Sequence, residues 1–444
     1  MADILFISLG CEKNLCDSEV MLGLLNEAGH KIVDDESLAE VIVINTCSFI
    51  HDAKVESINT ILEMAEYKNV GHLKALVVTG CLSERYKDEI LTEMPEVDAV
   101  VGASSYDAIV EAIDGALEGQ KPVIDKGVDY MPAYTGKRML STPPYMAYLK
   151  IAEGCNKRCT YCAIPSIRGH YRSEPMENII DMARKLVNDG VVEITLVAQE
   201  TTVYGVDIYS KKMLPELLRK LCAIEGLEWI RVLYCYPEEI TDELIEVMAT
   251  EPKICHYIDV PIQHSEDDVL RRMGRRTNRA ELVNIIGRLR ERIPDITIRT
   301  TLITGFPGES EEEYESMYRF VNEMEFERLG VFSYSAEEGT LAFSMPDQID
   351  ENVKEQRRDE LMELQQAISY ERGESLVGKC FKVLVEGYLY DEDIYSGRTY
   401  MDTADIDGKV FFSSEEELIS GSFVNVKITD FKEYDLFGEI VYDD

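Results

Sequence analysis

The sequence lacks the long apolar runs and the basic leader that direct a chain into or across a membrane. No stretch reaches the 18 or more apolar residues that a membrane helix requires. The first residues, MADILFISLGCEKN, place no basic segment ahead of their apolar run. Low-complexity tracts are missing too, so two or three folded domains are expected in the 444 residues. We therefore expect a cytoplasmic protein with no membrane span.

Positive charge is also scarce. There are 45 Lys and Arg residues against 84 Asp and Glu residues, which gives a formal net charge of −39. Because such a chain repels phosphate backbones, nucleic acid is an unfavourable direct target and a basic protein suits it better. The eleven cysteines are an odd number in a chain without a secretion signal, which argues against a disulfide framework. Metal ligands and buried thiols remain as alternatives.

The first part of the chain alternates apolar, strand-like runs with amphipathic stretches. The expected strands are residues 4–9, 41–45, 75–80 and 99–103. This alternation predicts an α/β unit with a doubly wound parallel sheet. Three of the runs lead directly into Cys11, Cys47 and Cys81. Because the ends of parallel strands share one edge of a sheet, we expect the three thiols to converge there.

Three further regions follow. Residues 126–142 show no periodicity, which indicates a linker. A second alternating series predicts a partial (βα)6 barrel of TIM type, with its chemistry at the C-terminal strand ends. Short β-rich runs near the C-terminus predict a small all-β, OB-like barrel. The expected domains are residues 1–125, 143–374 and 375–444.

The strongest signal is the run Cys155-Asn-Lys-Arg-Cys159-Thr-Tyr-Cys162, directly after the first strand of the expected barrel. Three thiolates this close in sequence must share a loop, and they suit a soft, thiophilic metal centre. A structural zinc site is the alternative. Such sites usually pair two C-x-x-C knuckles, and no second knuckle follows nearby. Three ligands would leave one iron of a four-iron cube open for a substrate.

This run resembles the signature of the radical S-adenosylmethionine superfamily, including Tyr161 before the third cysteine. The resemblance implies that Cys155, Cys159 and Cys162 hold a 4Fe–4S cluster whose open iron binds S-adenosylmethionine. One electron from that cluster would then release a 5′-deoxyadenosyl radical. Such radicals are needed where the target C–H bond is too weakly acidic for a side-chain base.

Further motifs narrow the resemblance to the methylthiotransferases of that superfamily. They lie at residues 8–14, 17–19, 45–49, 79–81, 155–169, 261–264 and 304–309, and the last β segment resembles a TRAM domain. The family implies a second 4Fe–4S cluster on Cys11, Cys47 and Cys81, whose open iron carries the sulfur to be inserted. S-adenosylmethionine would supply both the methyl group and the radical. Three buried core thiols are the alternative for these cysteines.

Two branches of this family differ in their substrates. One modifies an adenosine of tRNA, and the RimO type methylthiolates the β-carbon of an aspartate in protein twelve of the small ribosomal subunit. Residues 376–444 carry six Lys and Arg against sixteen Asp and Glu, whereas an RNA-binding barrel needs a positive groove. Residues 396–408 resemble the RimO version, except that Thr403-Ala404 stands where Ala-Pro is expected. We expect the ribosomal protein as substrate, with tRNA modification and a non-catalytic iron–sulfur sensor as alternatives.

Other candidate residues follow from barrel geometry. Gln199, Gln263 and Gly305 stand at expected strand ends, so we predict that they line the S-adenosylmethionine pocket. No catalytic side chain is assigned beyond the cluster ligands. The expected reductant is an electron donor such as a flavodoxin.

Two groups of residues have less specific interpretations. Five cysteines without ligand spacing are expected to pack in cores: Cys16, Cys222, Cys235, Cys255 and Cys380. Five arginines are either an RNA patch or, beside three acidic residues, a salt-bridged helix face that could hold a carboxylate: Arg271, Arg272, Arg275, Arg276 and Arg279.

Overall fold

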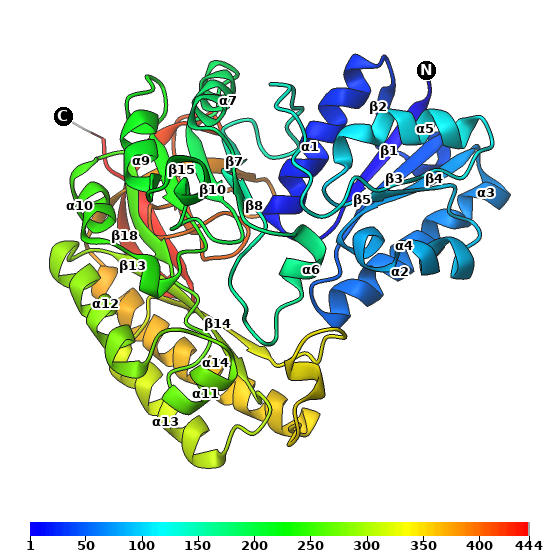
Figure 1. Cartoon of the computed structure of the whole chain (residues 1–444). Coiled ribbons are helices and arrows are strands. Elements are labelled where there is room, and N and C mark those ends of the chain that lie inside the picture. Colours follow the sequence, from blue (N-terminus) through cyan, green and yellow to red (C-terminus); the bar gives the residue numbers. More distant parts are fainter. Residues whose placement is uncertain (443–444) are drawn as a thin grey trace.

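The computed structural model describes residues 1–442 and shows three units in chain order (Figure 1). The N-terminal unit is a six-stranded parallel sheet with the order β2-β1-β3-β4-β5-β6. Its strands are β1 Asp3–Ser8, β2 Lys31–Val33, β3 Val41–Thr46, β4 Ala75–Gly80, β5 Ala99–Gly102 and β6 Val123–Ile124. Its helices are α1 Glu12–Glu27, α2 His51–Ala65, α3 Tyr67–Val70, α4 Cys81–Glu93 and α5 Ile109–Leu117. The doubly wound parallel sheet is confirmed.

Both faces of this sheet are covered because the side chains of its strands alternate between two cores. Val41 and Val43 of β3 pack with residues of α1 and α5 on one face. Ile42 and Ile44 pack with residues of α2 and α4 on the other. All residues of β3 and β4 are buried, as expected for central strands of a parallel sheet.

The second unit is a six-stranded parallel sheet, β14-β13-β12-β11-β10-β7, curved into a partial barrel. Its strands are β7 Met146–Lys150, β10 Glu193–Val197, β11 Trp229–Val232, β12 Ile254–Asp259, β13 Thr297–Thr304 and β14 Arg328–Ser333. A small antiparallel pair, β8 Ala152–Glu153 and β9 Arg172–Ser173, follows β7. The partial (βα)6 barrel predicted from the sequence is confirmed.

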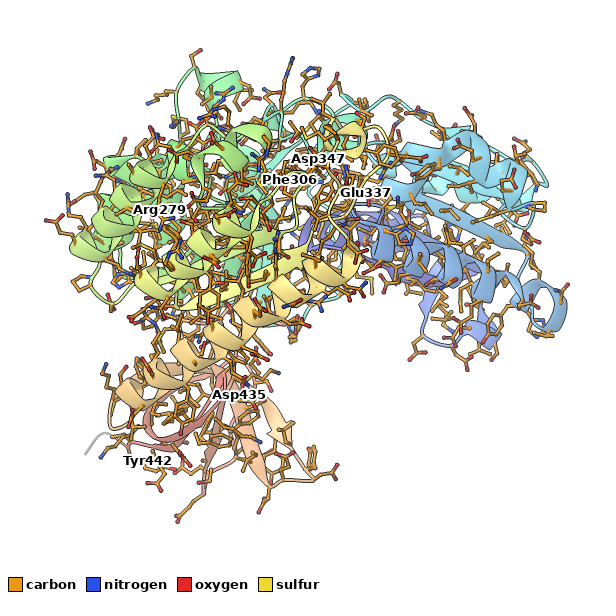
Figure 2. The ribbon with its side chains drawn as sticks, turned by 90° about the horizontal axis from the view of Figure 1, so that it is seen from below. Arg279, Phe306, Glu337, Asp347, Asp435 and Tyr442 are labelled. Atoms are coloured by element: carbon orange, nitrogen blue, oxygen red, sulfur yellow. The ribbon has the colours of Figure 1, made fainter. Side chains whose placement is uncertain are left out.

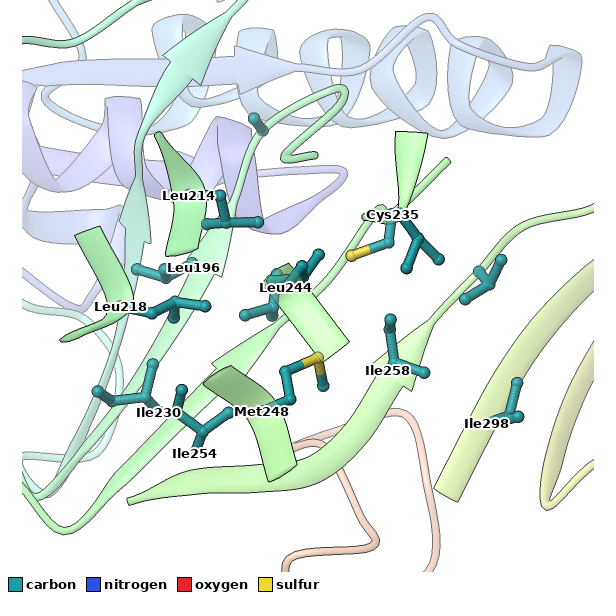
Figure 3. Close-up of a cluster of buried hydrophobic side chains, with 14 of the residues drawn as sticks. Leu196, Leu214, Leu218, Ile230, Cys235, Leu244, Met248, Ile254, Ile258 and Ile298 are labelled. Carbon is teal, nitrogen blue, oxygen red and sulfur yellow. The ribbon is translucent and has the colours of Figure 1, made fainter. Parts of the chain in front are cut away.

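Helices cover the outside of this barrel or lie in the loops at its strand ends, where the first of them packs against α4 of the N-terminal unit. They are α6 Ile164–Arg168, α7 Met176–Asn188, α8 Val206–Tyr209, α9 Leu214–Cys222, α10 Asp242–Thr250, α11 Asp267–Arg272, α12 Arg279–Arg292, α13 Glu311–Met324 and α14 Glu351–Leu376. Figure 3 shows how Leu218 of α9 and Met248 of α10 pack against Ile230 and Ile258 of the strands. Of the helices in residues 1–442, none is long and apolar enough to cross a membrane.

The third unit is a closed five-stranded barrel with the order β15-β16-β17-β19-β18, which confirms the small all-β domain. Its strands are β15 Cys380–Leu389, β16 Ile394–Arg398, β17 Val410–Ser413, β18 Phe423–Lys432 and β19 Asp435–Ile440. In Figure 2 it lies at the end of α14, with Asp435 and Tyr442 labelled. We call it the terminal barrel.

The segment expected to be a linker is anchored by one carboxylate of the N-terminal unit. Glu19 of α1 is fully buried and accepts hydrogen bonds from Arg138 Nε at 2.7 Å and from the Ser141 amide at 2.8 Å. Residues 137–142 therefore run along α1, and residues 126–142 form no helix or strand. The domain boundaries themselves stay a prediction.

The terminal barrel covers the N-terminal ends of the large barrel's strands. Leu384 and Ala404 of the terminal barrel share a buried cluster with Met146 and Trp229, the first residues of β7 and β11. Glu193, the first residue of β10, is 1% exposed. Its carboxylate accepts hydrogen bonds from Arg398 at 2.7 Å and from Arg231 at 3.2 Å.

This buried ion pair leads to a stability prediction. Glu193→Ala leaves the buried charge of Arg231 without its carboxylate partner and leaves Arg398 with Glu386 alone, so the free energy of unfolding should fall by about 3 to 5 kcal/mol. The single tryptophan, Trp229, stacks edge-on against Phe423 with ring centroids 4.9 Å apart, so its fluorescence during urea unfolding reports on this interface.

Glu228→Ala is the matched control for this prediction. It removes an exposed carboxylate that pairs with Lys382 at 2.8 Å across the same interface, and it should cost less than about 1 kcal/mol. Equal losses in the two variants would contradict a special role for the buried pair.

Candidate functional site

The first cysteine triplet lies along one edge of the N-terminal sheet. Cys11 follows β1 and is the N-cap of α1, Cys47 follows β3, and Cys81 begins α4 directly after β4. These strands are neighbours in the order β1-β3-β4. The β1/β3 boundary is where the strand order reverses, and open α/β sheets place their ligands in the crevice at such a point.

Two glycines allow the loops of this triplet to approach one another. A Cβ on Gly10 would lie 2.8 Å from Cys47 Cβ, and a Cβ on Gly80 would lie 2.3 Å from Asn45 Oδ1. Both glycines have positive φ angles, 88° and 95°, which side chains rarely adopt. Larger residues at either position would push the loops that carry Cys11 and Cys81 away from that of Cys47.

A network of buried hydrogen bonds fixes the positions of these loops. Asn14 Nδ2 donates to the Thr46 carbonyl at 2.8 Å, and Asn45 Nδ2 donates to the Asn14 carbonyl at 2.9 Å. The Ser57 hydroxyl accepts from the Cys47 amide at 3.0 Å. Both asparagines fall within the sequence motifs at residues 8–14 and 45–49, but their hydrogen bonds to the cysteine loops were not predicted.

The second triplet lies in the loop between β8 and α6, at the C-terminal side of the large barrel. The Cys155 amide donates to the Gly169 carbonyl at 3.1 Å, which closes the loop at its base. The Lys157 amide donates to Cys155 Sγ at 3.4 Å. Arg275 Nη1 and the Tyr236 hydroxyl each lie 4.0 Å from Cys159 Sγ. Donors of this kind stabilise thiolate sulfur.

Burial disfavours the thiolate form of several of these cysteines. Burial raises the pKa of Cys155 to about 11 and the pKa of both Cys81 and Cys162 to about 12. Metal binding must therefore displace protons from them. Among residues 1–442, no three His, Cys, Asp or Glu side chains close around a point as a single metal ion requires.

One arginine joins the two triplets. Arg168, the last residue of α6, is 2% exposed, and its Nη2 donates to Cys81 Sγ at 3.5 Å and to Asn14 Oδ1. Its Nη1 donates to Asp17 Oδ2 at 2.7 Å and to Glu153 Oε2 at 3.2 Å. Asp17 and Cys81 belong to the N-terminal unit and Glu153 to the barrel, so this guanidinium fixes one triplet relative to the other.

A second ionic contact joins the same two units. Glu337, in the segment after β14, is 2% exposed and accepts hydrogen bonds from Lys54 and Arg85 at 2.9 Å each. Arg85 also donates to the Ser48 carbonyl at 3.0 Å, beside Cys47. Figure 2 shows Glu337 where the barrel meets the N-terminal unit.

Gln199 lies beside the second triplet. Its Nε2 donates to Glu153 Oε1 at 2.6 Å, and its Oε1 is buried without a hydrogen-bond partner. Glu200 and Glu238 each hold one further unpartnered buried oxygen. Burial raises the pKa of Glu200 to about 7. Buried acceptors without partners indicate a place for the donor groups of a ligand.

Gln263 and Gly305 lie at other strand ends. Gln263 follows β12, is half-buried and has a φ of 72°. Gly305 follows β13 with a φ of 69°, and a Cβ there would lie 2.2 Å from Lys354 Cγ of α14. The glycine is thus required by the packing of α14. The assignment of Gln199, Gln263 and Gly305 to an S-adenosylmethionine pocket stays a prediction.

The other cysteines mostly pack as expected. Cys16, Cys235 and Cys255 are buried, and Cys222 is half-buried. Core packing is wrong for Cys380, which is exposed because it is the first residue of β15, at the end of a small barrel.

The arginines after Glu266 divide into two groups. Arg271, Arg272 and Arg279 pair with acidic side chains, as the salt-bridged interpretation predicted. Arg275 does not belong to that face: it is buried, stacks on Tyr236 and points toward Cys159. The turn at Gly274, with a φ of 71°, carries the chain inward after α11 ends.

Sequence reasoning did not place Arg168, Arg275 and Tyr236 beside the cysteines. The only signal was position: Arg168 closes the motif that follows Cys162, and Tyr236 follows a barrel strand. Their partners come from other domains or from distant parts of the barrel.

Family models match all three units. A model described as radical SAM superfamily matches residues 149–321, one described as Uncharacterized protein family UPF0004 matches residues 3–102, and a TRAM domain model matches residues 377–441. Among solved structures, the radical S-adenosylmethionine methyltransferase TsrM from Kitasatospora setae is similar with a TM-score of 0.58 and 14% identity, covering 75% of each chain. That likeness shows the fold.

Curated relatives are similar over nearly the whole chain. The "Ribosomal protein uS12 methylthiotransferase RimO" of Lachnoclostridium phytofermentans is 61% identical over 435 residues, covering 98% of this chain and 99% of the relative. The protein of the same name from Acetivibrio thermocellus is 52% identical and covers 98% and 97%. Identity at this level over three domains in the same order shows the family. The chain therefore belongs to the RimO family of radical S-adenosylmethionine methylthiotransferases.

Proposed function

We propose that this enzyme methylthiolates the β-carbon of an aspartate in ribosomal protein uS12. The observation that carries the proposal is the pair of cysteine triplets held on either side of Arg168, one in each of two domains. One triplet can serve radical formation and the other sulfur delivery. The relatives that match nearly the whole chain are named as uS12 methylthiotransferases, and we take the proposed substrate from them.

We assign the cofactors to the two triplets separately. Cys155, Cys159 and Cys162 hold one 4Fe–4S cluster beside S-adenosylmethionine, and Cys11, Cys47 and Cys81 hold a second. When bound, these groups supply the radical and the sulfur and methyl groups that the product gains. Gln199, Gln263 and Gly305 line the S-adenosylmethionine pocket in this proposal. The expected electron donor is a flavodoxin-like protein, and the expected compartment is the cytoplasm.

Glu153 holds the positions of Gln199 and Arg168 relative to each other. Burial raises the pKa of Glu153, but the charges of Lys150 and Arg168 outweigh it, and the pKa falls well below its usual range. Glu153 thus stays ionised and holds Gln199 at 2.6 Å on one side and Arg168 at 3.2 Å on the other. A continuous set of hydrogen bonds then runs from the radical side of the site to Cys81.

The terminal barrel supports a basic protein partner. Its exposed acidic side chains include two runs, residues 391–393 and 415–417. Asp402 and Asp407 do not contribute to this surface, because Asp402 pairs with Arg328 and Asp407 accepts from the Tyr257 hydroxyl at 2.7 Å within the protein. The remaining negative face suits a basic ribosomal protein better than tRNA.

The test uses the reconstituted holoenzyme under anaerobic conditions. Incubation with uS12, a reductant and S-adenosylmethionine should replace one hydrogen of the target aspartate with an SCH₃ group, detected by mass spectrometry of the peptide. uS12 with asparagine at that position is the control, and tRNA is supplied in a parallel reaction. Methylthiolated nucleoside without methylthiolated peptide would favour the tRNA alternative, and no 5′-deoxyadenosine at all would favour the sensor.

A further inference from the structure

An unusual lysine stands beside the first triplet. Lys13 lies two residues after Cys11, and its side chain is only 10% exposed. Its Nζ lies 3.3 Å from the centroid of the Tyr234 ring, which belongs to the large barrel. The nearest carboxylate oxygen, Glu12 Oε2, is 3.7 Å from Nζ and accepts a hydrogen bond from the Tyr234 hydroxyl at 2.8 Å. The ammonium is thus held at the junction of two domains.

Lys13 Nζ contacts Tyr234 and lies near Glu12, but no carboxylate or carbonyl of residues 1–442 accepts a hydrogen bond from it. A separation of 3.7 Å exceeds hydrogen-bonding distance, so Glu12 offsets the charge of the ammonium without occupying its N–H groups. Two other buried lysines are different. Lys150 donates to Glu153 at 2.6 Å, and Lys354 donates to the Tyr334 carbonyl at 3.0 Å. A buried ammonium without such bonds is costly unless a further anion completes its environment.

The position of Lys13 relates it to both triplets. Tyr234 and Tyr236 follow β11; Tyr234 contacts Lys13 beside Cys11, while the Tyr236 hydroxyl lies 4.0 Å from Cys159 Sγ. Tyr234 has a φ of 60°, and its amide donates to Asp259 Oδ2 at 2.9 Å. A strained backbone held in this way is typical of functional sites. Residues 234–236 thus connect the ammonium beside Cys11 with the surroundings of Cys159.

We propose that Lys13 binds the carboxylate of the substrate's aspartate side chain. The inference rests on the proposed function and adds the residue that selects the substrate. The carboxylate of an aspartate is bonded directly to its β-carbon. A cation that binds this carboxylate therefore also positions the C–H bond that reacts. An asparagine of the same shape lacks the charge, and the site then discriminates against it because the buried ammonium stays uncompensated.

The test measures binding in the absence of turnover. Reconstituted holoenzyme is titrated, without reductant or S-adenosylmethionine, with a synthetic uS12 peptide that spans the target aspartate, and with the same peptide carrying asparagine. The unchanged enzyme should prefer the aspartate peptide by at least about 30-fold, as expected for one partner of a buried charge pair. Lys13→Met should remove this preference, and Lys13→Arg should keep most of it.

The matched control is Lys31→Met, which removes an exposed lysine from the same unit. It should leave both affinities unchanged. Iron content is measured for every variant. Loss of the preference in Lys13→Met with full iron content, together with its retention in Lys13→Arg, supports the proposal.

Three outcomes overturn the proposal for Lys13. They are a retained preference in Lys13→Met, an equal loss of affinity for both peptides, and a Lys13→Met enzyme that lacks iron, since the last would make Lys13 a support for the cluster loop. A wild-type enzyme that neither binds nor modifies either peptide would instead reject the proposed substrate, so the two failures are distinguishable.

Discussion

Cys159→Ala should reduce the formation of 5′-deoxyadenosine by more than about 100-fold, since loss of a ligand exceeds the 10- to 100-fold typical of its outer partners. The thiol is one of only three in its loop, and alanine leaves Arg275 and Tyr236 facing no sulfur. The reaction is measured by chromatography with reductant and S-adenosylmethionine, without peptide.

Cys222→Ala is the control for Cys159→Ala, because it removes a half-buried thiol from α9, away from both triplets. It should form 5′-deoxyadenosine at the rate of the unchanged enzyme. Normal radical formation in Cys159→Ala would show that these three cysteines do not hold the reactive cluster.

Cys47→Ala should block formation of the methylthiolated peptide while leaving radical formation intact. Formation of the methylthiolated peptide should fall by more than about 100-fold, while 5′-deoxyadenosine continues to appear. The reason is that Cys47 lies at the end of β3 in the N-terminal sheet, whereas the loop with Cys155, Cys159 and Cys162 belongs to the barrel. Both products are measured in one reaction by mass spectrometry and chromatography.

Cys16→Ala is the matched control in the N-terminal unit. Its thiol is buried on α1 and lies 3.6 Å from the Tyr148 carbonyl, so its loss changes packing but not the triplet. We expect it to form both products. If Cys47→Ala and Cys159→Ala behave alike, the separate roles of the two triplets are wrong.

The fold was largely predictable from the sequence, because most elements are long and strongly amphipathic. Helices α7, Met176–Asn188, and α12, Arg279–Arg292, bury apolar residues at helical spacing, and α12 is also fixed by a capping box of Asn278 and Glu281. The strands β2 and β6 were not predicted. They are edge strands of only three and two residues, too short to show a periodicity.

The site was predictable only in part. Cysteine spacing and strand ends indicate which thiols belong together, and the sheet order places Cys11, Cys47 and Cys81 on adjacent strands. Arg168 and Lys13 could not be recognised as functional in advance. The environment of each depends on how the N-terminal unit docks against the barrel, and neither residue's spacing within its own segment reports on that docking.

The terminal barrel has a consequence for how the substrate reaches the reaction centre. The terminal barrel closes the large barrel at the end where the strands that start with Met146, Glu193 and Trp229 begin. A substrate peptide therefore cannot enter from that end. The opposite end of the barrel carries the loop with Cys155, Cys159 and Cys162, and the N-terminal unit docks beside it through contacts of Arg168 and Lys13. We therefore expect a protruding loop of the partner to reach the triplets more readily than a flat surface would.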